Sequence, residues 1–231
     1  MSVLECIGLT KHFGSTEALT NLHLQIAPGR ITGLLGPNGS GKSTLIKLAC
    51  GLLVPSSGQI AVCGATPGKE SRAQISYLPD KPCLPQWMTA RQLTDFYADF
   101  YPDFRRALAE DLLARLDIPQ RQRVRTMSQG TQEKVQLILA MSRDARLYLL
   151  DEPIGGADPA AREYILSTIL RHYRPDASIL LSTHLISEVE PMLDDVIFLD
   201  RGHLVLQASV DQIHREKQMS VDALFREVFR C

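Results

Sequence analysis

A glycine-rich segment of the sequence has the composition and spacing of a phosphate-binding loop. Residues 36–44 read GPNGSGKST and satisfy the pattern G-x-x-x-x-G-K-[ST], between the apolar segments ITGLL and LIKLACG. Glycines let successive backbone N–H groups point at one anion, and the N-terminus of the following helix adds partial positive charge. Lys42 can reach the β- and γ-phosphates of a nucleoside triphosphate, and the Ser43 hydroxyl suits Mg²⁺. The residues expected to bind the nucleotide are Gly36, Pro37, Asn38, Gly39, Ser40, Gly41, Lys42, Ser43 and Thr44.

Two adjacent carboxylates end a later apolar run and would complete such a site. In LYLLDEP (147–153), Asp151 is placed to hold Mg²⁺ directly or through water, and Glu152 to act as general base toward the attacking water. Adjacent acids could also mark a plain exit from a strand, but the phosphate loop favours the catalytic interpretation. His184 ends the run SILLSTH. A lone histidine is usually structural, yet the carboxyl end of a strand is where such sheets bind ligands, so His184 could hydrogen-bond the γ-phosphate.

Strands and helices must bring these residues together. Buried strands are expected at 31–35, 147–153, 178–184 and 196–200, with helices at about 159–173 and 185–193, as in a parallel sheet with crossover helices. NLHLQI (21–26) alternates as a half-buried strand does. From about 85 to 145 helical periodicity dominates, and Pro102 and Pro119 separate its segments. The tail 210–231 is expected to be helical without having to belong to the core.

Composition and charge exclude several function classes. The 231 residues are 45% hydrophobic and 22% charged, which is ordinary for a globular protein with a sizeable core. The formal net charge of -1 gives no general attraction to nucleic acid or anionic lipid. Five scattered cysteines without a C-x-x-C pair argue against a disulfide framework and a zinc site. With no signal sequence and no apolar run of about 20 residues, the chain is expected to be cytoplasmic.

The order of these motifs resembles the ATP-binding cassette (ABC) ATPases over about residues 3–217. The phosphate loop, LYLLDEP and STH follow one another, and TMSQGTQEK lies upstream of LYLLDEP, where that family carries its L-S-G-G-Q signature. The resemblance implies an α/β fold: a P-loop NTPase core with a mixed sheet, an N-terminal antiparallel β-subdomain and an inserted α-helical subdomain. The expected divisions are a single ABC ATPase domain at 1–217, with its core at about 1–84 and 146–209 and its helical subdomain at about 85–145, and a C-terminal helical tail at 218–231.

The resemblance also implies a head-to-tail dimer, of two identical or two related subunits, around two ATP molecules and Mg²⁺. In the family the signature of one subunit closes over ATP held by the phosphate loop of the other. Within its own subunit the signature segment is therefore expected to face solvent. Its serine and glycine agree with the family and two other positions differ; the signature residues are Ser128, Gln129, Gly130 and Thr131. Ser128 is also expected to cap the helix that begins here.

Other positions take their roles from the resemblance. Phe13 matches the aromatic residue that stacks on adenine, with a core phenylalanine at a strand end as the alternative. Asp158 matches the loop that bridges the two sites across the dimer, and Gly155 and Gly156 make this version more flexible than the usual S-A-L-D. Asp80 stands where the family usually has glutamine, so it is expected to contact Mg²⁺ or the attacking water; a solvated loop acid is the alternative. The expected catalytic residues are Lys42, Glu152 and His184, and the expected metal-side residues are Ser43, Asp80 and Asp151.

The partner that the resemblance implies is an integral membrane permease. In the family a short helix of the membrane subunit enters a groove in the neighbourhood that corresponds here to Asp80–Trp87. Trp87, the only tryptophan, is either an anchor in that groove or part of the core of the helical lobe. The basic run QRQRVR (120–125) is expected to be a solvated face, with contact to the permease or to lipid phosphates as the alternative.

Among the ABC proteins, the chain looks most like ATPase subunits of bacterial exporters of the ABC-2 type, whose permease is a separate chain. That group includes exporters linked to antibiotic resistance, cell-envelope stress and lipid export. Such a subunit would lie peripherally on the inner face of the plasma membrane. A soluble ABC ATPase that acts as a switch or assembly scaffold is the alternative, and nucleic acid is not an expected partner.

Overall fold

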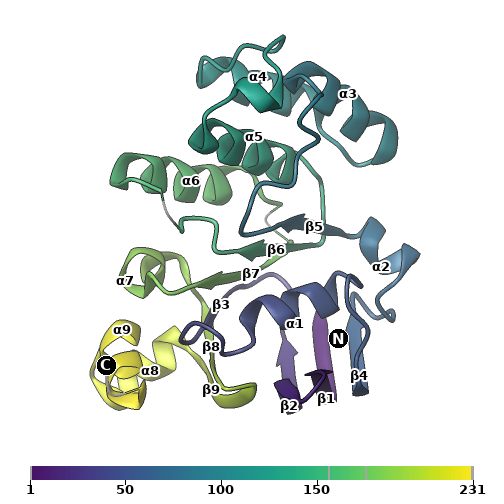
Figure 1. Ribbon diagram of the computed structural model, residues 1–231. Helices are drawn as coiled ribbons and strands as arrows, with labels where there is room; N and C mark the ends of the chain where they lie inside the picture. Colours follow the sequence, from purple (N-terminus) through teal and green to yellow (C-terminus); the bar gives the residue numbers. More distant parts are fainter. Residues whose placement is uncertain (1, 156, 175, 230–231) are drawn as a thin grey trace.

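The computed structural model describes residues 2–155, 157–174 and 176–229 (Figure 1). The strands are β1 (Leu4–Phe13), β2 (Thr16–Ile26), β3 (Ile31–Leu35), β4 (Ser57–Val62), β5 (Ile75–Leu78), β6 (Leu147–Asp151), β7 (Ser178–Thr183), β8 (Asp195–Asp200) and β9 (His203–Ser209). The helices are α1 (Lys42–Ala49), α2 (Lys69–Ala73), α3 (Ala90–Phe100), α4 (Arg106–Arg115), α5 (Gln129–Met141), α6 (Pro159–His172), α7 (Ile186–Val189), α8 (Val210–Lys217) and α9 (Val221–Phe229), with 3₁₀ turns η1 (Val124–Thr126) and η2 (Glu190–Met192).

The larger sheet places the strands that carry the site next to one another. Within the described ranges it has six strands in the order β5-β6-β7-β3-β8-β9, and neighbours are parallel except β8 and β9. The residues of β3, β6 and β7 are buried throughout, as parallel strands covered on both faces are. Because parallel strands end at the same edge, the segments that follow these three strands meet there. The prediction of a mixed α/β sheet is confirmed.

The N-terminal strands form a separate antiparallel sheet, as predicted. Its order is β2-β1-β4, with β1 paired to both neighbours. Leu4, Leu9 and Leu22 of this sheet share one buried cluster with Leu45 and Ile46 of α1. Figure 1 shows the sheet and α1 side by side, at the opposite end of the molecule from α3 and α4. This packing fixes the phosphate loop, which leads into α1, against the N-terminal sheet.

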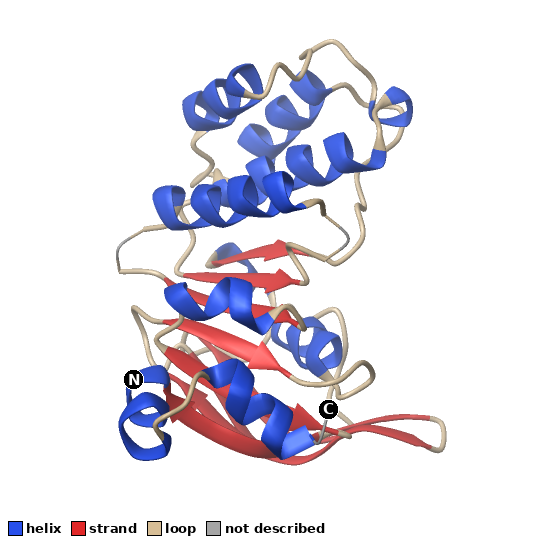
Figure 2. Cartoon of the chain, turned by 90° about the vertical axis from the view of Figure 1, so that its left-hand side faces the viewer, coloured by secondary structure: helices blue, strands red, loops and turns tan. Residues whose placement is uncertain are grey.

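Helices α3, α4 and α5 form a helical unit beyond β5 and β6 (Figures 1 and 2). A capping box begins α3: Thr89 Oγ1 accepts from the Gln92 N–H at 3.2 Å, and Gln92 Oε1 accepts from the Thr89 N–H at 2.9 Å. The apolar faces of the three helices share a buried cluster that runs from Leu84 to Leu139. The predicted helical insert is therefore present. None of the helices in the described ranges is long and apolar enough to cross a membrane.

The C-terminal helices differ from the expectation for the tail. They are helical, but they supply buried residues to the main core cluster: Val210, Ile213, Val221 and Leu224. The Phe225 ring also packs edge-on against the Phe198 ring of β8, with centroids 5.5 Å apart. An amphipathic helix next to an apolar sheet face buries its apolar side there. The tail is part of the core, which corrects the expectation that it need not be.

Glu190 of η2 ties both C-terminal helices to the body of the protein. Its Oε1 lies 3.0 Å from His214 Nε2 and accepts from the Val221 N–H at 2.8 Å, and its Oε2 accepts from the Asp222 N–H at 3.3 Å. Burial by itself raises the pKa of a carboxylic acid. Here these hydrogen bonds outweigh burial and hold the pKa of Glu190 below the ordinary 4.5. The folded C-terminal helices therefore stabilise the ionised carboxylate of Glu190.

Glu190→Gln is expected to lower the free energy of unfolding by about 1–2 kcal/mol at pH 7, because charge-assisted hydrogen bonds are lost. Since folding depresses this pKa, the stabilisation is complete above the unfolded pKa and is lost as the pH falls through the folded pKa. Urea unfolding at neutral pH and near pH 4 measures the difference between wild type and variant, which should shrink at the lower pH. Glu227→Gln, on the exposed face of α9, is the control. Equal losses in both variants would contradict this role of Glu190.

Candidate active site

The loop between β3 and α1 is tight, and two of its glycines are required by close neighbours. A Cβ atom on Gly36 would lie 2.3 Å from the carbonyl oxygen of Leu199. Gly41 has φ +108°, and a Cβ there would lie 2.6 Å from the carbonyl oxygen of Ala18. Any larger residue at either position would collide with backbone of β2 or β8. The loop therefore holds the shape that its sequence pattern predicts.

The first turn of α1 leaves donors available to an anion. Gly41, its N-cap residue, has no side chain to cap the helix, and the first turn has no acidic residue. The adjacent Ser40 hydroxyl is buried and has no hydrogen-bond partner among the described residues. Free N–H groups at a helix N-terminus favour bound phosphate. The phosphates of ATP fit this loop chemically.

Lys42 carries its charge inside the loop. The residue is 6% exposed, and its Nζ donates to the carbonyl oxygens of Gly36 at 2.7 Å and Pro37 at 3.1 Å. Burial lowers the pKa of Lys42, while Glu152 and Asp151 act in the opposite direction. A phosphate in the loop would provide a full anionic partner for this ammonium group.

Asp151 at the end of β6 reaches the phosphate loop. It is 1% exposed, and its Oδ1 accepts a hydrogen bond from Ser43 Oγ at 3.0 Å. Hydroxyl and carboxylate oxygens are the hard ligands that Mg²⁺ prefers, so this pair fits magnesium. The structure thus brings together two of the three predicted metal-side residues. Asp80, the third, is exposed in the loop after β5 and lines a pocket that Ser43 also lines.

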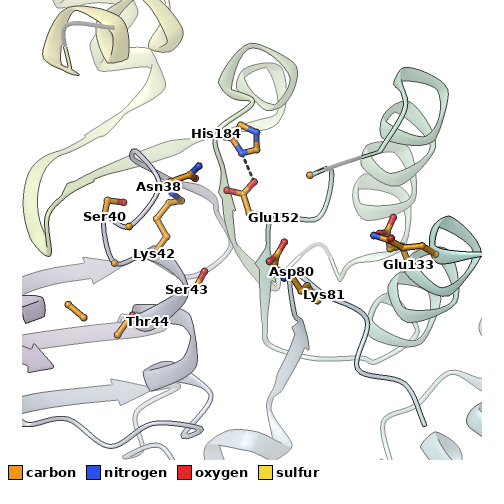
Figure 3. A pocket seen from close by; sticks show the side chains of 15 residues that line it. Asn38, Ser40, Lys42, Ser43, Thr44, Asp80, Lys81, Glu133, Glu152 and His184 are labelled. Carbon is orange, nitrogen blue, oxygen red and sulfur yellow. Dashed lines mark hydrogen bonds and ion pairs between the residues drawn. The ribbon is translucent and has the colours of Figure 1, made fainter. Parts of the chain in front are cut away.

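Glu152 and His184 face each other across the ends of β6 and β7. Glu152 Oε2 lies 3.0 Å from His184 Nδ1, with the side chains 14% and 52% exposed (Figure 3). The backbone of Glu152 has φ +50°, in the left-handed region that residues with a Cβ rarely adopt. Such conformations persist where the surroundings hold them, and they cluster at functional sites. Glu152 is therefore a partly exposed acid held in a defined position beside the phosphate loop.

One pocket of about 500 Å³ is lined by residues 38–44 of the phosphate loop, Glu152 and His184, and Asp151 is joined to it by its hydrogen bond with Ser43. The phosphate loop forms one side, Glu152 and His184 lie above it, and Asp80 and Lys81 project from the loop after β5 (Figure 3). Glu133 of α5 stands on the far side. Sequence reasoning missed Lys81 and Glu133. Lys81 directly follows Asp80, and Glu133 lies one helical turn after Gln129. Their spacing from predicted site residues could therefore have indicated that they lie near the site.

The signature segment begins α5, as predicted. Ser128 Oγ caps the helix by accepting from the Thr131 N–H at 3.2 Å, which confirms the predicted cap. Ser128 and Gly130 are exposed and do not line the pocket. Gln129 does line the pocket of its own chain, where its side chain donates to Glu133 Oε1 at 2.9 Å. Gln129 is exposed, as predicted for this segment, and its side chain also borders the pocket of its own chain.

Phe13 and Asp158 also lie outside the lining of the pocket. Phe13 at the end of β1 is 48% exposed, which excludes a buried core role, and Lys11 Nζ lies 5.1 Å from its ring centroid. Asp158 is exposed and caps α6 by accepting from the Ala161 N–H at 2.9 Å. Gly156, predicted to add flexibility beside Asp158, lies outside the described residues.

Trp87 is 65% exposed, which excludes a place in the core of the helical lobe. The alternative, that it anchors a helix of a membrane partner, stays a prediction. The carbonyl groups on either side of it, of Gln86 and Met88, accept from the N–H groups of Arg125 and Val124 at 3.0 and 2.9 Å. This pairing holds the backbone of the segment and leaves the Trp87 side chain at the surface.

Comparisons with known proteins agree with this geometry. The sequence matches the protein family described as ABC transporter over residues 19–155. The ABC transporter ATP-binding protein YtrB of Bacillus subtilis (strain 168) is 30% identical over 217 residues, which cover 93% of this chain and 74% of the relative. The Nod factor export ATP-binding protein I of Rhizobium sp. (strain N33) is 31% identical over 89% of this chain and 70% of its own length.

A solved structure, described as the ATP binding subunit of an ABC transporter, has a TM-score of 0.88 and 29% identity to this chain, and covers 99% of this chain and 100% of its own. In this chain the fold places a phosphate loop, two strand-end carboxylates and a histidine on one sheet edge. This chain therefore belongs to the ABC transporter family, as an ATP-binding subunit of the ATP-hydrolysing kind.

Proposed function

We propose that this chain hydrolyses ATP as one half of a head-to-tail dimer and thereby drives a separate membrane permease in the direction of export. The observation that carries the proposal is a pair of contacts on one sheet edge, Ser43 to Asp151 and Glu152 to His184, both 3.0 Å long. The first contact joins the residues proposed to bind Mg²⁺, and the second joins those proposed to activate water, beside the same phosphate loop. A relative named for Nod factor export supports the direction.

Each chemical role follows from the position of its group. Glu152 takes a proton from the water that attacks the γ-phosphorus in line, while the bond to the bridging oxygen of ADP breaks. His184 orients Glu152 and offers a hydrogen bond to the γ-phosphate, and Lys42 balances the phosphate charge. When bound by Ser43 and Asp151, Mg²⁺ would neutralise charge on the β- and γ-phosphates. Asp80 keeps an oxygen ligand at the pocket but adds negative charge near ATP.

The exposed signature supports the dimer. Ser128 and Gly130 stand at the N-terminus of the 13-residue helix α5, where backbone N–H groups favour an anion, yet they lie outside the pocket of their own chain. A second copy, placed head to tail, would bring its phosphate loop to them. In that arrangement Asp158 bridges the two sites and Phe13 stacks on adenine.

A groove lined by residues of β5, α3 and the segment after α1 supports a permease partner. It encloses about 710 Å³ between the core and the helical unit. Aromatic and apolar residues line it, among them Tyr97 and Phe100 of α3 and Leu52 after α1, and Phe100 is 65% exposed. Lys69 and Arg72 add positive charge at the groove. An apolar groove with basic residues fits a short amphipathic helix that carries an acidic group.

The test is co-expression with the membrane protein encoded beside this gene. Phe100→Asp should lower recovery of that membrane protein with the tagged chain by about tenfold, because an exposed aromatic side chain that the partner would cover is replaced by a charge. Val205→Asp, which changes another exposed apolar residue, on β9, should leave recovery unchanged. The ATPase activity of each purified variant reports folding. A chain that is fully active without any membrane partner would favour the switch or scaffold function instead.

A further inference from the structure

Ser182 in β7 is a buried polar residue that the site described so far does not use. It is fully buried, and it is paired in register with Asp151 of β6. Its neighbours along the strand are apolar at 179–181. A hydroxyl in the middle of a buried parallel sheet must be satisfied locally, so its partners indicate its role.

Both partners of the Ser182 side chain belong to the catalytic pair of acids. Ser182 Oγ donates to Asp151 Oδ1 at 2.6 Å and accepts from the Glu152 N–H at 3.0 Å. The same Asp151 oxygen accepts from Ser43 Oγ at 3.0 Å. A hydroxyl has one proton, and here it goes to the carboxylate. One side chain therefore contacts the metal-side acid and the backbone of the proposed base.

The backbone at Glu152 makes this contact more important. Its φ of +50° is strained for a residue with a Cβ, so the surrounding bonds must hold it. The Glu152 N–H is shared between the Ser182 carbonyl oxygen at 3.1 Å and Ser182 Oγ at 3.0 Å. Both acceptors come from Ser182. This conformation directs Glu152 Oε2 toward His184.

We propose that Ser182 is a positioning residue for ATP hydrolysis, which sets the Asp151 carboxylate for the metal and the Glu152 carboxylate for the attacking water. It contacts neither ATP nor the metal and acts through the two acids. The inference rests on the roles proposed for Asp151 and Glu152. It goes beyond them because it makes the two acids depend on one hydroxyl.

Ser178 provides a matched control on the same strand. It is also buried, and its hydroxyl accepts from the Gly29 N–H at 2.8 Å, at the end of β7 away from the phosphate loop. Ser182→Ala and Ser178→Ala each remove one buried hydroxyl from β7. If Ser182 served packing alone, the two variants would behave alike.

The first measurement is steady-state ATP hydrolysis. Ser182→Ala is expected to lower kcat about 10- to 100-fold, as loss of a residue that orients a ligand does, with KM for ATP changed less than about threefold. Ser178→Ala should keep kcat within about twofold of wild type. Ser182→Thr, which retains the hydroxyl, should recover most of the loss. Equal kcat in the two alanine variants would overturn the proposal.

The second measurement needs no turnover. Binding of a fluorescent ATP analogue is compared with Mg²⁺ present and with the metal removed by a chelator. Ser182→Ala should bind like wild type without Mg²⁺ but lose most of the affinity that Mg²⁺ adds, whereas Ser178→Ala should keep it. An unchanged Mg²⁺ effect in Ser182→Ala would overturn the metal half of the proposal.

Measurements on the wild-type chain distinguish a failure of this proposal from a failure of the metal-site assignment on which it rests. If wild type shows no Mg²⁺-dependent gain, the metal site itself is wrong and not only the role of Ser182. If Ser182→Ala does not fold, Ser182→Cys decides, because a thiol has similar volume but is a weak hydrogen-bond donor. A kcat within twofold of wild type then overturns the proposal, and a drop of about tenfold supports it.

Discussion

Glu152→Gln is expected to stop ATP turnover while ATP stays bound. The amide keeps the shape of the side chain but cannot accept the proton of the attacking water, so the rate of phosphate release should fall by about 10²- to 10⁴-fold. The phosphate loop, Lys42 and Asp151 are untouched, so affinity for ATP should remain. Because hydrolysis would separate the subunits of the proposed dimer, the variant should accumulate an ATP-stabilised dimer. Phosphate release and the mass of the chain in solution, with and without ATP, measure both effects.

Glu163→Gln is the matched control for this prediction. Glu163 is an exposed residue of α6, outside the pocket, and the same chemical change there should leave turnover and mass unchanged. Near-normal hydrolysis in Glu152→Gln would contradict the assignment of Glu152 as the general base. Loss of turnover together with loss of ATP binding would show instead that Glu152 is needed to build the pocket.

The sequence was most informative where a residue type at a fixed spacing is required by chemistry. Gly36 and Gly41 could be predicted because only glycine fits the backbone there, and Lys42 and Ser43 because phosphate and Mg²⁺ demand them. Strand residues that are apolar throughout indicated the buried core strands. The order of the motifs along the chain then indicated which strand ends meet.

Contacts between segments that are distant along the chain could not be predicted from the sequence in the same way. Ser182 could not be assigned from the sequence, because the serine of STH becomes important only when parallel pairing sets it opposite Asp151. The buried face of α9 depended on Phe198, a residue of β8 that is remote in sequence from it. The two alternatives for Trp87 could not be separated from the sequence, because its exposure depends on backbone pairing of its neighbours with residues 124–125. In each case the deciding partner is distant along the chain.

Two inactive variants should restore activity when mixed, if the sites are shared between subunits. Lys42→Ala removes the ammonium group from the phosphate loop, and Gly130→Asp sets a carboxylate on the signature, which in the proposed dimer faces the partner's γ-phosphate. A Cβ on Gly130 would meet nothing within 4 Å, so the second variant should fold as wild type does. A mixed dimer then has one intact site, made from the loop of one chain and the signature of the other.

Each variant alone has no intact site and should be inactive. In an equal mixture about half of the dimers are mixed and each has one of two sites intact, so turnover should return to about a quarter of wild type if sites work independently. Differently tagged chains should also co-purify in the presence of ATP. If each site instead used the signature of its own chain, mixing would restore nothing, because every chain would still carry its own defect. Absence of both restored turnover and ATP-dependent pairing would therefore rule out the head-to-tail arrangement.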